Sequence, residues 1–180
     1  MALEQHQRMT VEEYFQLEEN DPSGVRYEYE DGYVYAMAGG TANHDTVNFN
    51  LQRILWGLLR GRNCRVYSGN MKVQVTETRY YYPDVTVTCD ARDRGTAHIL
   101  RSPRVVIEVL SPSTELADHT RKLQSYCAHP TIEEYLLVDS RRMRAEIYRK
   151  EEGKWIYDIL APTAEITLNS LSIHFRLVDA

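Results

Sequence analysis

The order of helix and strand patterns in this chain predicts a mixed α/β (α+β) fold, with a central mixed β-sheet flanked by helices. A helical apolar repeat covers residues 43–59, and strand patterns cover 64–67, 71–75, 80–89 and 104–110. A second helical repeat covers 115–129, and another strand pattern covers 134–138. Helices that alternate with strands in this way usually pack on the faces of one sheet.

Local signals at both ends of the chain predict further elements. Thr10 and Glu13 have the spacing of a capping box, which predicts a helix from there to about residue 19. Asp31-Gly32 separates two strand patterns, residues 25–30 and 33–37, and this dipeptide is typical of a tight hairpin turn. Near the C-terminus, we expect a hairpin of residues 145–149 and 155–160 and a last strand near 171–175.

The length and composition indicate one globular domain over residues 1–180. No apolar stretch approaches the ~20 residues that cross a bilayer, and residues 1–8 lack the pattern of an export signal, so we expect a cytoplasmic protein without a membrane partner. The three cysteines are odd in number, far apart and free of Cys-x-x-Cys pairs. We therefore expect reduced, mostly buried thiols at Cys64, Cys89 and Cys127.

The formal net charge of −5 argues against tight, nonspecific coating of DNA, which requires many Lys and Arg side chains. A net negative charge is still compatible with a local basic surface. Two clusters can either bind nucleic acid or form a solvated rim: Arg60, Arg62 and Arg65, and Arg141, Arg142 and Arg144. The run Tyr80 to Tyr82 has two interpretations as well, base stacking or ordinary strand formation.

Two acidic residues on strand patterns are the main candidates for chemistry. Asp84 follows Pro83 and falls on the polar face of its strand, and Glu108 interrupts the apolar run 105–110. If the two strands are neighbours, the carboxylates can meet and hold a hard cation such as Mg²⁺. Asp84 can also be a simple turn residue after proline, whereas Glu108 in an apolar strand needs a partner to offset its desolvation.

The helix that follows Glu108 carries Asp118 and Lys122, which are four residues apart and therefore on one face. A lysine beside a metal site can orient water and neutralise charge that develops on a phosphate. The alternative is a solvated helix pair, which contributes only ~0.3–0.5 kcal/mol.

These residues, in this order of elements, resemble the PD-(D/E)XK nuclease superfamily. More closely, the chain resembles the Uma-two family of putative restriction endonucleases, long catalogued as a domain of unknown function. The resemblance covers nearly the whole chain, in residues 9–14 (MTVEEY), 26–28 (RYE) with Asp31-Gly32, 37–41 (MAGGT) before His44, 82–85 (YPDV), 106–114 (VIEVLSPST), 118–122 and 134–138 (EYLLV). It implies a restriction-endonuclease-like core.

The resemblance also implies roles for individual residues. Asp84 and Glu108 correspond to the acids that bind Mg²⁺, with Mn²⁺ as a substitute, and the Val109 carbonyl corresponds to a further ligand. The superfamily usually has its lysine two positions after the second acid, where this chain has Leu110. In related families that lysine can lie on the following helix, which makes Lys122 the candidate catalytic lysine.

Three residues are auxiliary candidates. Glu28 resembles an acid of the family motif, and Asp118 accompanies Lys122; for Glu28 the simpler interpretation is a surface strand residue. His44 and Asn48 lie four residues apart near the start of the long helix and can face the same cleft. A histidine in this position can instead cap or pack the helix.

We therefore expect a Mg²⁺-dependent DNA endonuclease, which acts as a homodimer because two-fold assemblies suit the cutting of two strands. The alternative is a catalytically inactive module that binds nucleic acid or oligomerises and has kept the nuclease fold; Leu110 and the net acidity favour it. Hydrolysis of another phosphodiester would use the same residues.

Overall fold

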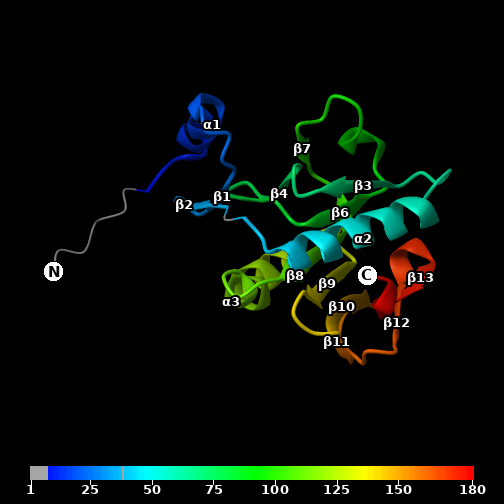
Figure 1. Ribbon diagram of the computed structural model, residues 1–180. Coiled ribbons are helices and arrows are strands. Elements are labelled where there is room, and N and C mark those ends of the chain that lie inside the picture. Colours follow the sequence, from blue (N-terminus) through cyan, green and yellow to red (C-terminus); the bar gives the residue numbers. More distant parts are fainter. Residues whose placement is uncertain (1–7, 38) are drawn as a thin grey trace.

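The computed structural model describes residues 8–37 and 39–180 and confirms the mixed α/β fold class (Figure 1). In this part of the chain the strands form a six-stranded, a five-stranded and a two-stranded sheet. No described helix is long and apolar enough to cross a membrane. The interpretation of residues 1–7 as free of an export signal concerns a segment outside the described residues.

The six-stranded sheet is mixed and has the order β11-β10-β9-β8-β6-β3. Only the β8–β9 pair in it is parallel, so the chain crosses over between these strands through the helical segment 115–128. The strands are β3 (Arg65–Ser68), β6 (Val85–Thr88), β8 (Pro103–Leu110), β9 (Glu134–Asp139), β10 (Ala145–Glu151) and β11 (Lys154–Leu160).

The five-stranded sheet begins with the hairpin that Asp31-Gly32 predicts. Asp31 and Gly32 have φ angles of 50° and 99°, as a tight hairpin turn requires. The sheet consists, in spatial order, of β2 (Tyr33–Ala36), β1 (Tyr27–Glu30), β5 (Arg79–Tyr81), β4 (Lys72–Thr76) and β7 (Ile99–Leu100). Helix α1 (Val11–Asn20) precedes it and starts with the expected capping box of Thr10 and Glu13.

Helix α2 (Ala42–Leu58) covers one face of the six-stranded sheet (Figure 1). Its buried Leu51 and Leu55 share a core with β6, β8 and β9. A C-terminal hairpin, β12 (Glu165–Leu168) and β13 (Ile173–Arg176), closes the same core. Strand β12 has no counterpart among the predicted elements, whereas β10, β11 and β13 were expected.

The opposite face of the six-stranded sheet carries the second core. Along β8, alternate side chains belong to different cores: Val105, Ile107 and Val109 to the α2 side, Val106 and Leu110 to the other. Glu108 therefore shares the face of Val106 and Leu110, as the strand alternation predicts. This places a carboxylate between the sheet and the segment 115–128.

The predicted helix 115–129 contains an unusual turn. It consists of α3 (Glu115–Ala117), a π-helical turn (Asp118–Lys122) and α4 (Leu123–Ala128). Short π-helical turns often occur at functional sites, and this one carries both Asp118 and Lys122. Shorter 3-10 turns lie at Ala91–Asp93, Asn169–Leu171 and Leu177–Asp179.

The prediction of one strand over residues 80–89 was wrong, because β5 and β6 are separate and lie in different sheets. Pro83 stands at the break and has no N–H for a strand ladder. Strands β3 and β4 are divided between the two sheets in the same way. The stacking hypothesis was also wrong for Tyr80 and Tyr81, whose side chains are buried in two different hydrophobic clusters, whereas Tyr82 is 8% exposed and lines a cavity.

The prediction of three reduced thiols was wrong for two of them. Cys64 and Cys89 form a disulfide, and Cys127 is a free, half-buried thiol whose pKa burial raises to about 11. In the antiparallel β3–β6 pair, Arg65 lies opposite Thr88, so Cys64, which precedes Arg65, lies opposite Cys89, which follows Thr88. Sequence separation alone cannot show such a strand pairing.

Candidate active site

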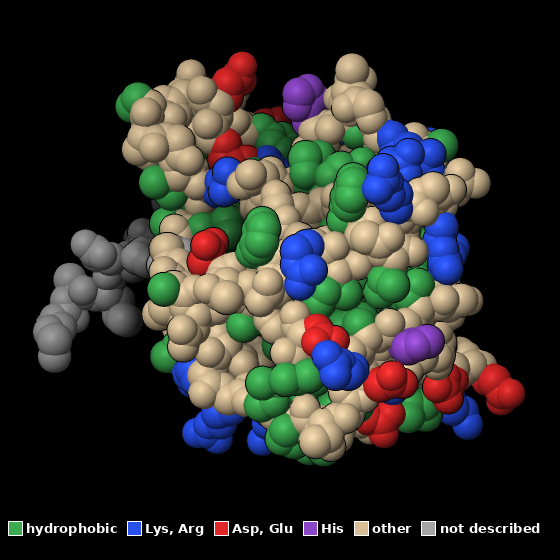
Figure 2. All heavy atoms as spheres, turned by 45° about the vertical axis from the view of Figure 1, so that its right-hand side comes forward, with side chains coloured by type: hydrophobic (Ala, Val, Ile, Leu, Met, Phe, Trp, Pro, Cys, Tyr) green, Lys and Arg blue, Asp and Glu red, His purple; other side chains and the backbone are tan. Residues whose placement is uncertain are grey.

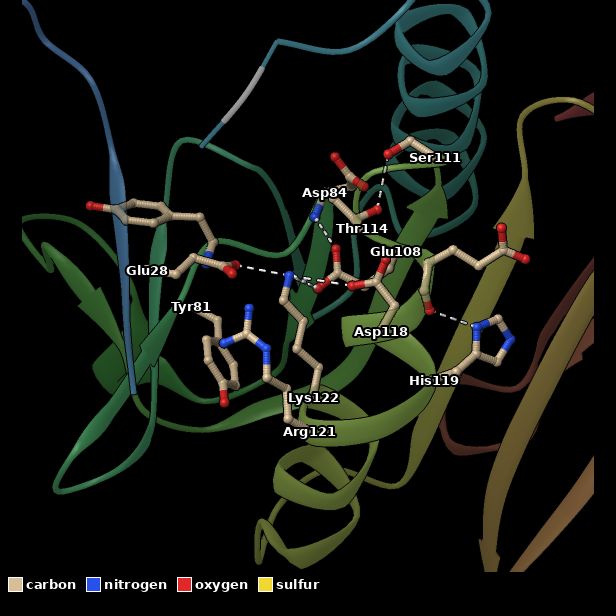
Figure 3. Close-up of polar contacts among 12 residues, drawn as sticks. Glu28, Tyr81, Asp84, Glu108, Ser111, Thr114, Asp118, His119, Arg121 and Lys122 are labelled. Carbon is tan, nitrogen blue, oxygen red and sulfur yellow. Dashed lines mark hydrogen bonds and ion pairs between the residues drawn. The ribbon is translucent and has the colours of Figure 1, made fainter. Parts of the chain in front are cut away.

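A cavity of about 260 Å³ lies where the β1–β2 hairpin, the six-stranded sheet and the helical segment 115–128 meet. All six candidate side chains line it: Glu28, His44, Asp84, Glu108, Asp118 and Lys122. Figure 3 shows most of them directed toward one another from these separate elements. The structure thus brings together residues that are up to 94 positions apart in the chain.

Lys122 is the central side chain of this site and is only 5% exposed. Its Nζ lies 2.9 Å from Glu28 Oε1, 3.1 Å from Glu108 Oε1 and 3.4 Å from Asp118 Oδ1. Burial lowers the pKa of Lys122, but the surrounding carboxylates outweigh this effect and hold the pKa well above its usual value. The amine is therefore positively charged at neutral pH.

Glu108 joins Lys122 to Asp84. Its Oε1 accepts hydrogen bonds from Lys122 Nζ and from the Tyr126 hydroxyl at 3.0 Å, and its Oε2 accepts one from the Asp84 backbone N–H at 3.2 Å. Burial raises the pKa of Glu108 well above its usual range; Lys122 opposes this rise, and the charges of Asp118 and Asp84 add to it.

Asp84 lies just before β6 and connects β8 with α2. Its Oδ2 accepts the backbone N–H of Val109 at 2.8 Å, and its Oδ1 accepts the side-chain N–H of Asn48 at 3.3 Å. His44 Nε2 is 3.3 Å from the same carboxylate. The hydrogen bond to Asp84 raises the pKa of His44, against the effect of burial.

Asp118 is 1% exposed, yet neither of its carboxylate oxygens accepts a hydrogen bond from residues 8–37 or 39–180. Its contact with Lys122 is an ion pair at 3.4 Å. Burial is the largest cause of the raised pKa of Asp118, and Lys122 counteracts it. Buried oxygens without donors are costly, so this carboxylate favours a proton or a cation nearby.

The donor set fits a hard divalent cation. Three carboxylates, Glu28, Glu108 and Asp118, contact the buried Lys122 amine, and a fourth, Asp84, lines the same cavity. Among residues 8–37 and 39–180, no cluster of three His, Cys, Asp or Glu side chains is arranged to hold a metal by itself. Mg²⁺ in proteins often takes only one or two carboxylates and keeps several waters.

Sequence reasoning missed two residues of the site. Tyr126 donates to Glu108, and its position four residues after Lys122, on the same helix face, was the available signal. Arg121 lines the cavity, where its guanidinium pairs with Glu30 and lies 4.0 Å from the ring centroid of Tyr35. No pattern in the sequence indicated that an arginine next to Lys122 would face the same cavity.

The chain is similar to known proteins over most of its length. The family model Uma2, described as "Putative restriction endonuclease", matches residues 11–177. Two uncharacterized proteins of Synechocystis are similar over most of their length: slr1290 is 36% identical over 172 residues (94% of this chain, 90% of the relative), and sll1609 is 30% identical over 170 residues (92% and 95%).

A solved structure has a similar fold. The crystal structure of a putative nuclease belonging to DUF820 from Anabaena variabilis superimposes with a TM-score of 0.78 and covers 95% of this chain and 96% of that one. The sequence identity is 19%, so this similarity concerns the fold.

Proposed function

Since the chain belongs to the Uma2 family, we propose that it is a divalent-metal-dependent endonuclease that hydrolyses phosphodiester bonds of DNA. The observation that supports this most is the contact of Lys122 with Glu108 at 3.1 Å, beside Asp84 and inside one cavity. Two acids and an amine around a common space are what metal-assisted phosphodiester hydrolysis needs.

In this proposal, Asp84 and Glu108 hold Mg²⁺ or Mn²⁺, and the Val109 carbonyl is a further oxygen ligand. A bound cation supplies Lewis-acid polarisation of a phosphate oxygen. His44 and Asn48 keep the Asp84 carboxylate in place through their contacts with it. Glu28 and Asp118 keep the Lys122 amine at the edge of the cavity.

Lys122 takes the part of the superfamily lysine. Leu110, which occupies the usual lysine position, is buried in the second core. What matters for catalysis is where the ammonium group lies relative to the phosphate, and a helix can deliver it as well as a strand. The amine then stabilises negative charge that develops on the phosphate oxygens and orients the attacking water.

Nicking of supercoiled plasmid DNA with Mg²⁺, with Mn²⁺ and with a chelator tests the proposal. The substitutions Asp84→Asn, Glu108→Gln and Lys122→Met should each reduce the rate ~100-fold or more, as expected for the loss of a group that stabilises transition-state charge. Glu134→Gln is a matched control, because Glu134 is a buried acid that accepts bonds from Asn169 and Ser170 outside the cavity. Unchanged rates in all three site variants would refute the assignment.

The second candidate is a catalytically inactive module that binds nucleic acid or oligomerises, and Leu110 at the usual lysine position favours it. A nucleic-acid-binding module of this kind would bind DNA without cutting it. Calorimetric titration with Mn²⁺ separates the candidates, since the inactive module should lack a cation site that depends on Asp84 and Glu108.

A homodimer belongs to the proposal because the cutting of both strands takes two active sites. Light scattering of the purified protein, with and without a short DNA duplex, measures its mass directly. A monomer in both conditions would restrict the proposed activity to nicking.

A further inference from the structure

One stretch of this acidic protein is entirely free of acidic residues. Residues 46–76, from α2 to β4, contain no Asp or Glu, although the whole chain has a formal net charge of −5. The same stretch contains four exposed arginines, Arg53, Arg60, Arg62 and Arg65; its one lysine, Lys72, is buried and pairs with Glu18. A local excess of positive charge in an otherwise acidic chain attracts an anionic partner to this part of the surface.

The solvent face of α2 presents aromatic and basic side chains alternately. Phe49, Arg53 and Trp56 follow one another at intervals of four and three residues on α2, and Arg60, in the turn just after the helix, continues this ridge four residues later. Phe49 is 64% and Trp56 61% exposed. The guanidinium of Arg60 lies 5.6 Å from the ring centroid of Trp56.

At the C-terminal end of this ridge lies a groove of about 320 Å³. Two aromatic side chains, Trp56 and Tyr67, and two arginines, Arg60 and Arg65, line this groove. The Tyr67 hydroxyl donates to the Asp93 carbonyl at 2.6 Å, which fixes that ring in place. Figure 2 brings this side of the molecule forward, and basic and hydrophobic side chains lie interspersed on it.

We propose that this groove, between the end of α2 and β3, binds an unpaired nucleotide segment of the nucleic acid substrate. A base stacks on Trp56, and Arg60 and Arg65 contact the phosphates. Stacking on aromatic rings beside basic side chains is how single strands are bound without sequence preference. The inference rests on the proposed function for the nature of the substrate and adds a second binding site to it.

A second copy of the chain fits this surface less well than nucleic acid. In a two-fold dimer the same patch lies on both sides of the interface, so the arginines of the two copies would approach one another. Like charges at an interface are unfavourable, whereas a phosphate backbone complements them.

The groove is separate from the candidate active site. Asn48, which contacts Asp84, and Arg60 are 12 positions apart, and this corresponds to about 18 Å along the helix axis. At ~3.4 Å per nucleotide of a strand, about five nucleotides are needed to reach from one to the other. The groove therefore holds a part of the strand that lies beyond the scissile phosphate.

Fluorescence of Trp56 tests the proposal without cleavage. The chain has two tryptophans, so Trp155→Phe leaves Trp56 as the only one. Titration with a ten-residue oligothymidylate in chelator should quench its emission, and a blunt duplex of equal length should quench it less. Anisotropy of labelled oligothymidylate with Trp56→Ala, in the otherwise unchanged chain, gives a second readout in case Trp155→Phe does not fold.

The charge-reversal variant Arg60→Glu should weaken oligothymidylate binding at least ~10-fold and reduce its salt dependence. Lys154→Glu is the matched control, since Lys154 is an exposed basic residue at β11, the opposite edge of the six-stranded sheet from β3. Equal effects of both variants, or no quenching of Trp56, would overturn the inference. The inference would also be overturned if the protein were a dimer, and if Trp56→Ala dissociated this dimer but left DNA binding unchanged.

The experiment also separates this inference from the proposed function. Quenching of Trp56 in a natural protein that cuts no DNA with Mg²⁺ or Mn²⁺ supports the groove and refutes only the endonuclease. Cleavage that continues at full rate and affinity in Arg60→Glu and Trp56→Ala refutes only the groove.

Discussion

The amine of Lys122 lies 3.1 Å from the carboxylate of Glu108, and both side chains are buried. Glu108 comes from the middle of a central strand, and Lys122 comes from the π-helical turn that follows it in the chain. The two charges offset each other's desolvation, but Glu28 and Asp118 compete for the same amine. The stability of the metal-free protein therefore depends on the positive charge of Lys122.

Lys122→Met should destabilise the protein by about 3–5 kcal/mol near neutral pH, because it leaves buried carboxylates without their counter-charge. Urea unfolding measures the change. The double variant Lys122→Met/Glu108→Gln should recover part of the loss, since it removes one of the uncompensated charges. If the loss of unfolding free energy in the double variant equalled the sum of the losses in Lys122→Met and Glu108→Gln, this result would contradict the pairing.

Asp118→Asn should stabilise the metal-free protein at neutral pH. Burial raises the pKa of Asp118 in the folded state, so between its unfolded and folded pKa values the native protein binds more protons than the unfolded chain. The stability of the natural protein therefore falls as pH rises through that window, and the variant lacks this loss. The advantage of Asp118→Asn should be absent near pH 3.5 and grow with pH, as urea unfolding at several pH values will reveal.

Much of the fold follows from local sequence signals. The Asp31-Gly32 turn, the capping box at Thr10 and the apolar repeat of α2 each act over a few residues, and the structure confirms them. Long-range pairing is different. The strand patterns around Pro83 do not indicate which sheet each half joins, so they predict one strand where the structure has β5 and β6, and they do not indicate the disulfide of Cys64 with Cys89.

For the site, the sequence indicates the six candidate side chains but neither Tyr126 and Arg121 nor the full arrangement. Strand alternation placed Glu108 on the correct face, and helix spacing placed Asp118 beside Lys122. The position of Glu28 depends on the contact between the two sheets, which no local pattern encodes. The roles of these residues in metal binding and catalysis stay predictions.

His44→Gln should destabilise the metal-free protein at low pH and have little effect at high pH. The hydrogen bond to Asp84 raises the pKa of His44 in the folded state. The contribution of the His44–Asp84 contact to stability is therefore fully present below the pKa of His44 in the unfolded chain, about 6.5. This contribution is lost as pH rises through the pKa of His44 in the folded protein.

Urea unfolding in chelator at pH 6 and pH 9 measures this difference, and NMR titration of the imidazole gives the pKa directly. His174→Gln serves as the control, because His174 is exposed on β13. A folded-state pKa of His44 at or below 6.5 would show that the ring does not interact with Asp84 as an ion pair.

Removal of the disulfide should lower the free energy of unfolding by about 3.5 kcal/mol, the value for a loop of this size. The bond joins residues 25 positions apart and ties the start of β3 to the end of β6, at the edge of the sheet that carries the proposed nucleotide groove. The variant Cys64→Ser/Cys89→Ser should therefore unfold at lower urea concentration than the natural protein, whereas Cys127→Ser should change stability little, because Cys127 is a free thiol.

Alkylation of the unreduced, denatured protein should modify one cysteine, and alkylation after reduction should modify three. Three modified cysteines without reduction would show that the bond does not form in solution, and the natural protein and the double variant should then have similar stability.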